Sequence, residues 1–494
     1  MARHESVWPI WLEGDIMSKY KLMEHQKECC NILRKKKRFA IFADCGTGKT
    51  LMMIHHLQHL WKKKGVRKVI IFCPSSVTLN WKNEIEKFSK IKFKVQILEG
   101  TKQQRDNLDL SEINILIVNY EKSIKDFKKL LKFGADVLVL DESHRVKTHT
   151  SQTTRSIYKL SKNIERKYIM TGTPMSKGYE DLYSQFMIMK PEVFGTSFPQ
   201  FREKYLVMGG YMNKIVKGYK NKKNLKKKVD KNCYKVRKQD CMDLPPVTEK
   251  TLYCNLGAKG RKHYKEIMED MFTIINEVGI DINKAKSLLD ENEVDYKGCS
   301  YIGILDKASD YSEEYKIALD LAITKSIKLH QICGGFIKTE QGTVMVDDSK
   351  IKLLKDLLND TPKPVVIFCN FRSELDFLKS DLANGVSERS IKTITGSTHN
   401  KGEIVEQFQS GDIDILLVQI ASGSTGINLT KSHNAIFFSM NYKLTDYLQA
   451  KSRLDRKGQS EPVTLYYLVC QDTIDEELLN ILYKREKTLL KLMK

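Results

Sequence analysis

Short apolar runs alternate with helix-like segments in this chain, and the alternation occurs in two separate stretches. In the first half, apolar runs of four or five residues are separated by helical patterns such as Leu51–Lys62 and Trp81–Ser89. Such runs are typical of strands that are buried on both faces of a parallel sheet. The alternation therefore predicts an open α/β domain. Its expected strands are Phe39–Ala43, Val69–Cys73, Val95–Leu98, Ile115–Val118, Val137–Leu140 and Tyr168–Thr171.

The alternation returns near residue 350 and predicts a second α/β domain. Between the two, residues 259–290 look helical, and residues 214–238 hold twelve Lys or Arg residues and one acid, Asp230. The expected strands of the second domain are Val365–Cys369, Ile391–Thr395, Ile415–Val418, Ala435–Ser439 and Thr464–Val469. We expect two tandem parallel-sheet lobes with helical insertions between them. The expected divisions are an accessory segment (1–16), lobe one (17–195), a helical insertion with a basic linker (196–348) and lobe two with a C-terminal helix (349–494).

Composition and charge narrow the class of partner. A net charge of +22 over 494 residues favours a polyanion such as nucleic acid, although a general lysine bias would give the same value. No apolar run reaches the roughly 18–20 residues that span a bilayer, and the N-terminus lacks the apolar region of a secretory signal. The eleven cysteines form no C-x-x-C pair, which predicts no metal cluster and a reducing compartment. We therefore expect a cytoplasmic protein with no membrane partner.

A glycine-rich segment follows the first expected strand and opens a helix. The backbone N–H groups of Gly46, Thr47 and Gly48 would close around phosphate oxygens. Lys49 would reach the β- and γ-phosphates, and the Thr50 hydroxyl would ligate Mg²⁺. The alternative is a chance glycine-rich turn, which the strand before it and the helix after it disfavour. The segment predicts a nucleotide site.

Two adjacent acids end a later strand and are expected to be catalytic. Asp141 would hold Mg²⁺, and Glu142 would orient and deprotonate the attacking water. Upstream of the phosphate loop, the amide of Gln26 can donate to and accept from an adenine edge, which would select ATP. The alternatives are a solvated acidic loop and a surface glutamine.

Two arginines near the end of the chain are the expected arginine fingers. Arg453 and Arg456 are spaced i, i+3, so a helix would place both on one face. There they would neutralise charge on the γ-phosphoryl group in the transition state. The alternative is a solvated basic helix end. A distant second lobe that supplies arginines to the nucleotide is typical of a motor and unlike a metabolic kinase.

The order of these motifs along the chain resembles superfamily-two helicases, and among them the Swi/Snf-type DNA translocases. The resemblance covers about residues 20–470. It implies RecA-like lobes, ATP and Mg²⁺ as cofactors, and a DNA-dependent ATPase; the lysine bias suggests a compact phage or bacterial member. The segments that carry it are Ala43–Thr50, Cys73–Glu84, Asn119–Glu121, Leu140–His144, Thr171–Pro174, Phe368–Phe371, Thr395–Thr398, Gly423–Leu429 and Gln449–Gln459.

The resemblance also assigns contacts to DNA and to the coupling machinery. Hydroxyls and amides at four positions would meet phosphates without reading bases. These positions are Ser75, Asn119, Ser397 and Thr425. The alternative for each residue is a cap or a loop position. Four further residues would couple the nucleotide site to DNA. They are His144, Thr171, Thr173 and Gln449.

The expected activity is ATP-driven, sequence-independent translocation on duplex DNA. One alternative keeps the motor but has it separate strands or migrate junctions in recombination or replication. A second alternative is an ATP-gated binding switch with little turnover, which the presence of Glu142, Arg453 and Arg456 disfavours.

Overall fold

The computed structural model describes most of the chain as two units. It covers residues 21–209, 215–277, 282–291, 324–339, 342–385, 389–425 and 427–493. The first unit contains the described residues up to Gly172 together with Ser184–Pro191 and Asn232–Cys241, and the second unit contains the rest. The expected accessory segment 1–16 lies outside the described residues. No helix within these ranges is long and apolar enough to cross a membrane.

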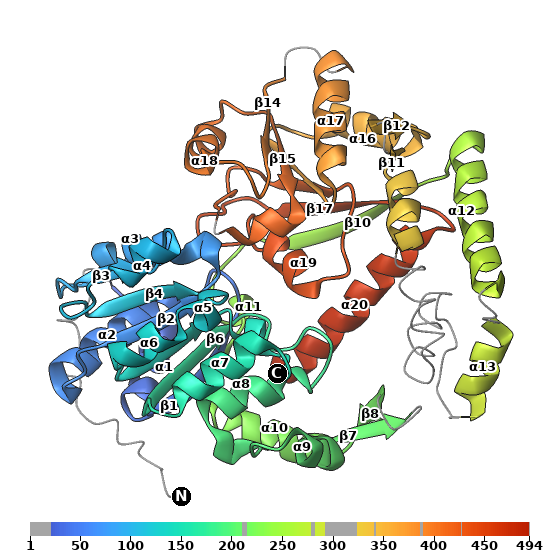
Figure 1. The fold of residues 1–494 in the computed structure, drawn as a ribbon. Helices are drawn as coiled ribbons and strands as arrows, with labels where there is room; N and C mark the ends of the chain where they lie inside the picture. The colour runs from blue at the N-terminus through green and yellow to red at the C-terminus, as the bar shows by residue number, and fades with distance from the viewer. Residues whose placement is uncertain are drawn as a thin grey trace, which may run out of the picture. The chain divides into compact units, whose positions relative to one another are not determined.

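The first unit is built on a sheet of seven parallel strands (Figure 1). The strand order is β3-β4-β2-β5-β6-β1-β9. All strands predicted for this half are confirmed, each to within two residues at either end. Because the strands are parallel, their carboxyl ends meet at one edge of the sheet. The strands are β1 (Arg38–Ala43), β2 (Val69–Cys73), β3 (Val95–Ile97), β4 (Ile115–Asn119), β5 (Val137–Asp141), β6 (Arg166–Thr171) and β9 (Cys233–Val236).

The last strand of this sheet comes from the stretch that the sequence assigned to the basic insertion. β9 pairs in parallel with β1, from Ala40 opposite Cys233 to Ala43 opposite Val236. Three of its four residues are buried, but the lysine Lys235 interrupts the apolar run. A four-residue strand among lysines gives too little periodicity to be recognised. The first sheet therefore contains a strand that lies about 60 residues beyond β6.

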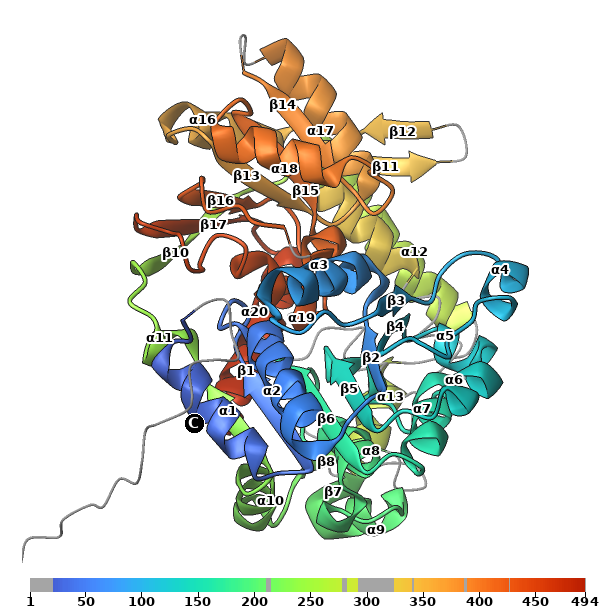
Figure 2. The same cartoon turned by 90° about the vertical axis from the view of Figure 1, so that its left-hand side faces the viewer.

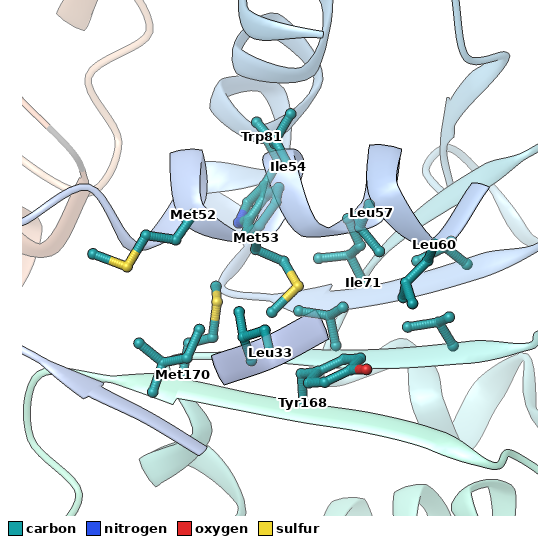
Figure 3. Packing of buried hydrophobic residues seen from close by; sticks show 14 of the residues in the cluster. Leu33, Met52, Met53, Ile54, Leu57, Leu60, Ile71, Trp81, Tyr168 and Met170 are labelled. Carbon is teal, nitrogen blue, oxygen red and sulfur yellow. The ribbon is translucent and has the colours of Figure 1, made fainter. Parts of the chain in front are cut away.

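One face of the first sheet carries an apolar core beneath α1, α2 and α3. Figure 3 shows Met53 and Leu57 of α2 packed over Ile71 of β2 and Tyr168 of β6. Each such side chain that is fully buried contributes roughly 1.5–3 kcal/mol. Figure 2 shows α2 lying along the sheet. The helices of this unit are α1 (Glu24–Arg34), α2 (Lys49–Lys64), α3 (Thr78–Phe88), α4 (Lys102–Asp106), α5 (Lys122–Lys125), α6 (Phe127–Phe133), α7 (Gln152–Ser161) and α11 (Lys238–Cys241), with 3₁₀ turns η2 (Ser75–Val77) and η3 (Ser143–Val146).

The second unit has its own sheet of six parallel strands, in the order β10-β17-β16-β13-β15-β14. The strands predicted for this half are confirmed. β10 was not predicted, because most of its residues are exposed and it follows a Pro-Pro turn. It lies beside β17 in Figure 1. The strands are β10 (Val247–Cys254), β13 (Val365–Cys369), β14 (Ile391–Ile394), β15 (Ile415–Gln419), β16 (Asn434–Phe437) and β17 (Val463–Cys470).

Helices cover both faces of the second sheet. Leucines of α16 and α17 pack on one face in a single apolar cluster. On the other face Phe437 stacks between Phe368 and Tyr467, with ring centroids 5.0 and 5.1 Å apart, and Tyr447 of α19 hydrogen-bonds Tyr467. The helices are α16 (Ser349–Asp360), α17 (Arg372–Gly385), α18 (Lys401–Ser410), α19 (Leu444–Lys451) and α20 (Ile474–Met493), with the 3₁₀ turn η6 (Ile420–Thr425).

The rest of the second unit comes from the middle of the chain. The predicted helical stretch 259–290 is confirmed where the structure describes it, with residues 278–281 outside the described ranges. The elements are η4 (Pro191–Val193), α9 (Phe198–Tyr205), β7 (Leu206–Gly209), β8 (Ile215–Tyr219), α10 (Lys222–Asp230), α12 (Ala258–Glu277), α13 (Ile282–Glu291), β11 (Phe336–Thr339) and β12 (Gly342–Met345). The helix α8 (Asp181–Met189) has residues in both units.

Candidate nucleotide site

The phosphate loop follows β1 and needs glycine at two positions. Gly46 has φ 91° and Gly48 has φ 86°, a region that residues with a side chain rarely adopt. A Cβ at Gly48 would also lie 2.3 Å from Nε2 of Gln26. Gly48 directly precedes α2, so the loop delivers the chain to the N-terminus of a helix. Such a terminus favours anions, because its first N–H groups have no partner within the helix.

The lysine of the loop lies against the backbone of the same loop. Lys49 Nζ donates to the carbonyl oxygens of Ala43 at 2.8 Å and Asp44 at 3.2 Å. Burial acts against its charge, but nearby Cys45, Glu142 and other acids outweigh burial and raise the pKa of Lys49. The ammonium is therefore held charged at the loop. Thr50 lies in the first turn of α2.

Gln26 is buried and joins the first turn of α1 to the phosphate loop. Its Oε1 accepts from Met23 N at 3.0 Å, and its Nε2 donates to Thr47 O at 3.1 Å. The neighbouring His25 places Nε2 at 2.9 Å from the same carbonyl. The sequence analysis missed His25, because a lone histidine beside Gln26 carries no pattern of its own. The amide of Gln26 thus positions the loop, and its contact with adenine stays a prediction.

The aspartate of the acidic pair ends β5 and is held by two donors. Asp141 Oδ2 accepts from the indole nitrogen of Trp81 at 2.8 Å, and Oδ1 accepts from Glu142 N at 3.0 Å. The hydroxyl of Tyr120 donates to the Asp141 carbonyl at 2.6 Å. Burial and the neighbouring charge of Glu142 raise the pKa of Asp141. A carboxylate in this environment is stabilised by a cation, which fits a ligand of Mg²⁺.

The glutamate of the pair is oriented by two residues that the sequence assigned to coupling. Thr171 Oγ1, at the end of β6, donates to Glu142 Oε2 at 3.0 Å. His144 Nδ1 lies 3.2 Å from the same oxygen. Burial acts to raise the pKa of Glu142, but contacts with His144, Lys49 and Thr171 outweigh burial and lower the pKa. The structure therefore brings His144 and Thr171 to the carboxylate of Glu142.

Residues that follow β6 and β9 also pack against the phosphate loop at this edge of the first sheet. A Cβ at Gly172 would lie 3.2 Å from the Ala43 carbonyl, so the segment after β6 packs tightly on the loop. On the other side, Asp44 Oδ2 accepts from Lys238 N at 3.0 Å, just after β9. Tyr234 of β9 donates to the carbonyl of His25 at 3.0 Å. β9 thus contacts both the phosphate loop and α1.

The candidate DNA contacts of the first unit lie at the same edge. Ser75 is exposed in η2, directly after β2. Asn119 ends β4, next to β2, and its Oδ1 accepts from Lys122 N at 3.1 Å. Asn119 is therefore already engaged in a turn, which is the alternative role that the sequence left open. Both stay predictions as DNA contacts.

In the second unit, the shared helix face expected for the two arginines is wrong. α19 ends at Lys451, so Arg453 and Arg456 lie in the turns that follow it. Arg456 Nη1 donates to Ile427 O at 3.3 Å, and Arg453 is largely buried. Gln449, also buried, lies in the last turn of the helix. The arginines are therefore placed by a folded turn and not by helical spacing.

A residue without an assigned role holds that turn. Gln459 Nε2 donates to Ser432 O at 3.0 Å and Leu454 O at 3.3 Å. Its Oε1 lies 2.9 Å from His433 Nδ1 and accepts from the backbone of residues 460 and 461. The sequence showed Gln459 only as the end of a motif.

The remaining predicted residues of the second unit are distributed over three places. Ser397 is exposed after β14, with Oγ 3.1 Å from Thr395 Oγ1. Thr425 ends η6, and its side chain lies outside the described part of the chain. Thr173 is buried and belongs to the second unit, whereas Thr171 belongs to the first.

The fold and the site together define a nucleotide-binding protein with two parallel-sheet units and a phosphate loop. The family model "SNF2-related domain" matches residues 25–307, and "Helicase conserved C-terminal domain" matches residues 349–458. The first match covers more than half of the 494 residues. The chain belongs to the SNF2-related family and carries a helicase C-terminal domain.

Several curated proteins are similar over nearly all of the chain. "ATP-dependent helicase fft1" of Schizosaccharomyces pombe is 26% identical over 90% of this chain and 50% of its own length. "DNA repair and recombination protein RAD54B" of Homo sapiens is 24% identical over 93% of this chain and 53% of its own length. The chain thus spans about half the length of these relatives. Both relatives are eukaryotic, and the expected phage or bacterial origin stays a prediction.

One solved structure is similar over nearly all of the chain. "Sulfolobus solfataricus SWI2/SNF2 ATPase core in complex with dsDNA" is 20% identical, covers 98% of this chain and 95% of its own, and has a TM-score of 0.45.

Proposed function

We propose that the protein is an ATP-dependent translocase on double-stranded DNA. The observation that carries the proposal is the convergence of Lys49, Asp141, Glu142 and Thr171 at the carboxyl edge of one parallel sheet. Phosphate, metal and water ligands belong together at such an edge in phosphate-loop enzymes. Membership of the SNF2-related family and relatives named as helicases support the same activity.

The donor set of the first unit fits ATP with Mg²⁺. Lys49 and the loop N–H groups would bind the phosphates, and Thr50 with Asp141 would hold the ion. When bound, Mg²⁺ would neutralise charge on the transferring phosphoryl group. Glu142, fixed by Thr171 and His144, would orient the attacking water. A carboxylate with a lowered pKa is a weak base, so orientation is its larger contribution.

The second unit would supply positive charge and a second grip on DNA. Arg453 and Arg456 would stabilise the transition state of hydrolysis, as arginine fingers do. Ser75 and Asn119 in the first unit, with Ser397 and Thr425 in the second, would contact phosphates independently of sequence. Gln449 and Thr173 would couple hydrolysis to movement. The partner is DNA, as duplex or junction, and the compartment is cytoplasmic.

Phosphate release in the presence and absence of duplex DNA tests the ATPase. Lys49→Ala and Glu142→Gln should each lower the DNA-stimulated rate by roughly 10²-fold or more. Lys64→Ala, at the exposed end of α2, is the matched control and should retain the rate of the wild type. Equal rates in the wild type and Lys49→Ala would show that the site is wrongly assigned.

Release of a third strand from linear duplex DNA tests movement. Displacement that needs ATP and leaves the duplex paired is the expected result. Unwinding of the duplex, or activity on four-way junctions alone, would instead support the strand-separating or branch-migrating alternative. ATP-dependent DNA binding with very slow hydrolysis would support the switch.

A further inference from the structure

Three cysteines from separate elements of the second unit meet in its interior. Cys254 ends β10 and lies opposite Cys470, which ends β17. Their sulfur atoms are 3.5 Å apart. Cys333, in the helical residues 324–333, accepts at its carbonyl from Cys470 Sγ at 3.4 Å. Because these residues are far apart in the sequence, no C-x-x-C spacing indicated the cluster.

A carboxylate completes a set of possible metal ligands. One oxygen of Asp475, in the first turn of α20, lies with the sulfur atoms of Cys333 and Cys470 within 4.8 Å of one another. All three residues are buried. In a tetrahedral zinc site with Zn–S bonds of about 2.3 Å, neighbouring ligands lie about 3.8 Å apart. The three ligand atoms are therefore close to the spacing that one tetrahedral ion requires.

The two oxygens of Asp475 have different surroundings. Oδ2 accepts from Lys350 Nζ at 2.5 Å and from Cys470 N at 3.2 Å. Oδ1 lies 3.5 Å from Nε2 of the buried His330, and this nitrogen makes no hydrogen bond among the described residues. A buried imidazole nitrogen without a hydrogen bond is costly in an apolar interior, and imidazole is a common zinc ligand. His330 Nε2 lies beside the carboxylate of the cluster, and this observation is independent of the thiols.

The charge balance of the cluster also suits a cation bound by thiolates. Lys350 is buried, with a second hydrogen bond to Phe438 O at 3.0 Å. A divalent ion with three thiolates and a carboxylate carries net negative charge, and the ammonium would offset part of it. Thiolate sulfur selects zinc over magnesium or calcium.

We infer that Cys254, Cys333, Cys470 and Asp475 form a structural Zn²⁺ site, with the imidazole of His330 beside it as an alternative to the carboxylate. The ion would tie the ends of β10 and β17 to the helical residues 324–333 and to α20. The site is independent of ATP and of the proposed translocation. It differs from the expectation from cysteine spacing that the chain holds no metal cluster.

Metal content of the full chain tests the inference. Protein stripped by a chelator and reduced with a phosphine is titrated with Zn²⁺ alone, and bound zinc is measured by mass spectrometry after gel filtration. One ion per chain is expected. Titration with Co²⁺ should give the ultraviolet charge-transfer band of thiolate ligands. No zinc retained by folded, reduced protein would overturn the inference, as would a Co²⁺ complex without that band.

Zinc binding by cysteine variants identifies which residues are ligands. Cys333→Ala and Cys470→Ala should each lower zinc affinity by at least about tenfold, a loss that even indirect contacts to a zinc site produce. Cys369→Ala, buried in β13 but in another apolar cluster, should bind zinc as the wild type does. Cys254→Ser, at a half-buried position, covers the case in which the buried variants fail to fold. Undiminished zinc binding in Cys254→Ser and Cys333→Ala would contradict the ligand set.

The same thiols could instead pair with each other. A peroxide-treated sample that forms a Cys254–Cys470 disulfide, while the reduced protein takes up no zinc, would replace the metal site with a redox pair. Peptide mapping by mass spectrometry reads this result directly.

Discussion

The indole nitrogen of Trp81 donates a hydrogen bond to Asp141 Oδ2 at 2.8 Å. Trp81 lies on α3 and is almost fully buried, whereas Asp141 ends β5. The helix that follows β2 is thus linked to a carboxylate expected to bind Mg²⁺. Since Ser75 lies just before α3, this contact connects a candidate DNA-binding turn with the acidic pair inside one unit.

Removal of this hydrogen bond should weaken the metal site. In Trp81→Phe, Asp141 loses a donor to its charged form, so its pKa rises further and the carboxylate binds cations less well. The Mg²⁺ concentration for half-maximal ATPase should increase by roughly 10–150-fold, the equivalent of the 1.5–3 kcal/mol of a hydrogen bond to a charged group. Trp61→Phe on α2, whose ring packs on Phe93, is the control. An equal change in both variants would assign the effect to packing.

The hydroxyl of Thr171 should matter for turnover more than for binding. Thr171→Val removes the donor to Glu142 Oε2 at nearly constant volume, which should lower kcat by about tenfold while KM for ATP changes little. Thr171→Ser should recover most of the rate. Thr393→Val is the matched control, because the Thr393 hydroxyl makes no hydrogen bond among the described residues. If Ser and Val at residue 171 behave alike, the hydroxyl does not position Glu142.

Gln459 should be needed for the stability of the turn that carries the arginines. Gln459→Leu leaves the carbonyl of Ser432 without a donor among the described residues, whereas the carbonyl of Leu454 keeps the backbone N–H of Arg456. Urea unfolding should therefore show a loss of about 1–3 kcal/mol in the second unit, the range for one unsatisfied buried group. Gln407→Leu, on the exposed side of α18, should change stability by less than about 1 kcal/mol. A stable Gln459→Leu variant would refute this role.

The buried carboxyl of Glu374 should make the second unit sensitive to pH. Burial raises its pKa to about 7, although Ser439 and the N–H groups of Asn370 and Phe371 favour the charged form. A raised pKa in the folded state adds stability below the unfolded value of 4.5, and this stability is lost as the pH rises through about 7.

Comparison with Glu374→Gln isolates that titration. Relative to this variant, the wild type should lose about 1–3 kcal/mol between pH 5 and pH 8. Most of the interval between pKa 4.5 and about 7 lies in this range, and each pH unit of the interval is worth about 1.4 kcal/mol. Urea unfolding at both pH values measures the difference. The exposed Glu406→Gln on α18 should follow the wild type. A difference that does not change with pH would mean that Glu374 is not the titrating group.

The sequence predicted the parts of the fold that periodicity encodes. The eleven expected strands are continuous apolar runs, because strands that are buried on both faces of a parallel sheet consist almost entirely of apolar residues. β9 and β10 were not predicted. β9 is short and contains Lys235, and most residues of β10 are exposed. A strand at the edge of a sheet is stabilised mainly by pairing with its neighbouring strand. When that neighbour is far away in the sequence, the pairing leaves no local sequence pattern.

The residues of the candidate site also fall into those that the sequence predicted and those that it did not. The phosphate loop and the acids at the end of β5 are contiguous motifs, so their places could be predicted. His25, Trp81 and Tyr234 act through side chains that meet only in the folded chain, and no spacing indicates them. The prediction that Arg453 and Arg456 lie on one helix was wrong, because i, i+3 spacing fits a turn as well as a helix.

β9 sets the order in which the first unit is completed during synthesis. The ribosome makes about 60 residues between β6 and β9, most of them belonging to the second unit. At about 5–20 residues per second this interval lasts roughly 3–12 s. During that time β1 is an open edge, and Asp44 of the phosphate loop lacks the Lys238 amide that holds it in the finished fold. The nascent chain therefore passes through a stage in which its phosphate loop is held on one side only.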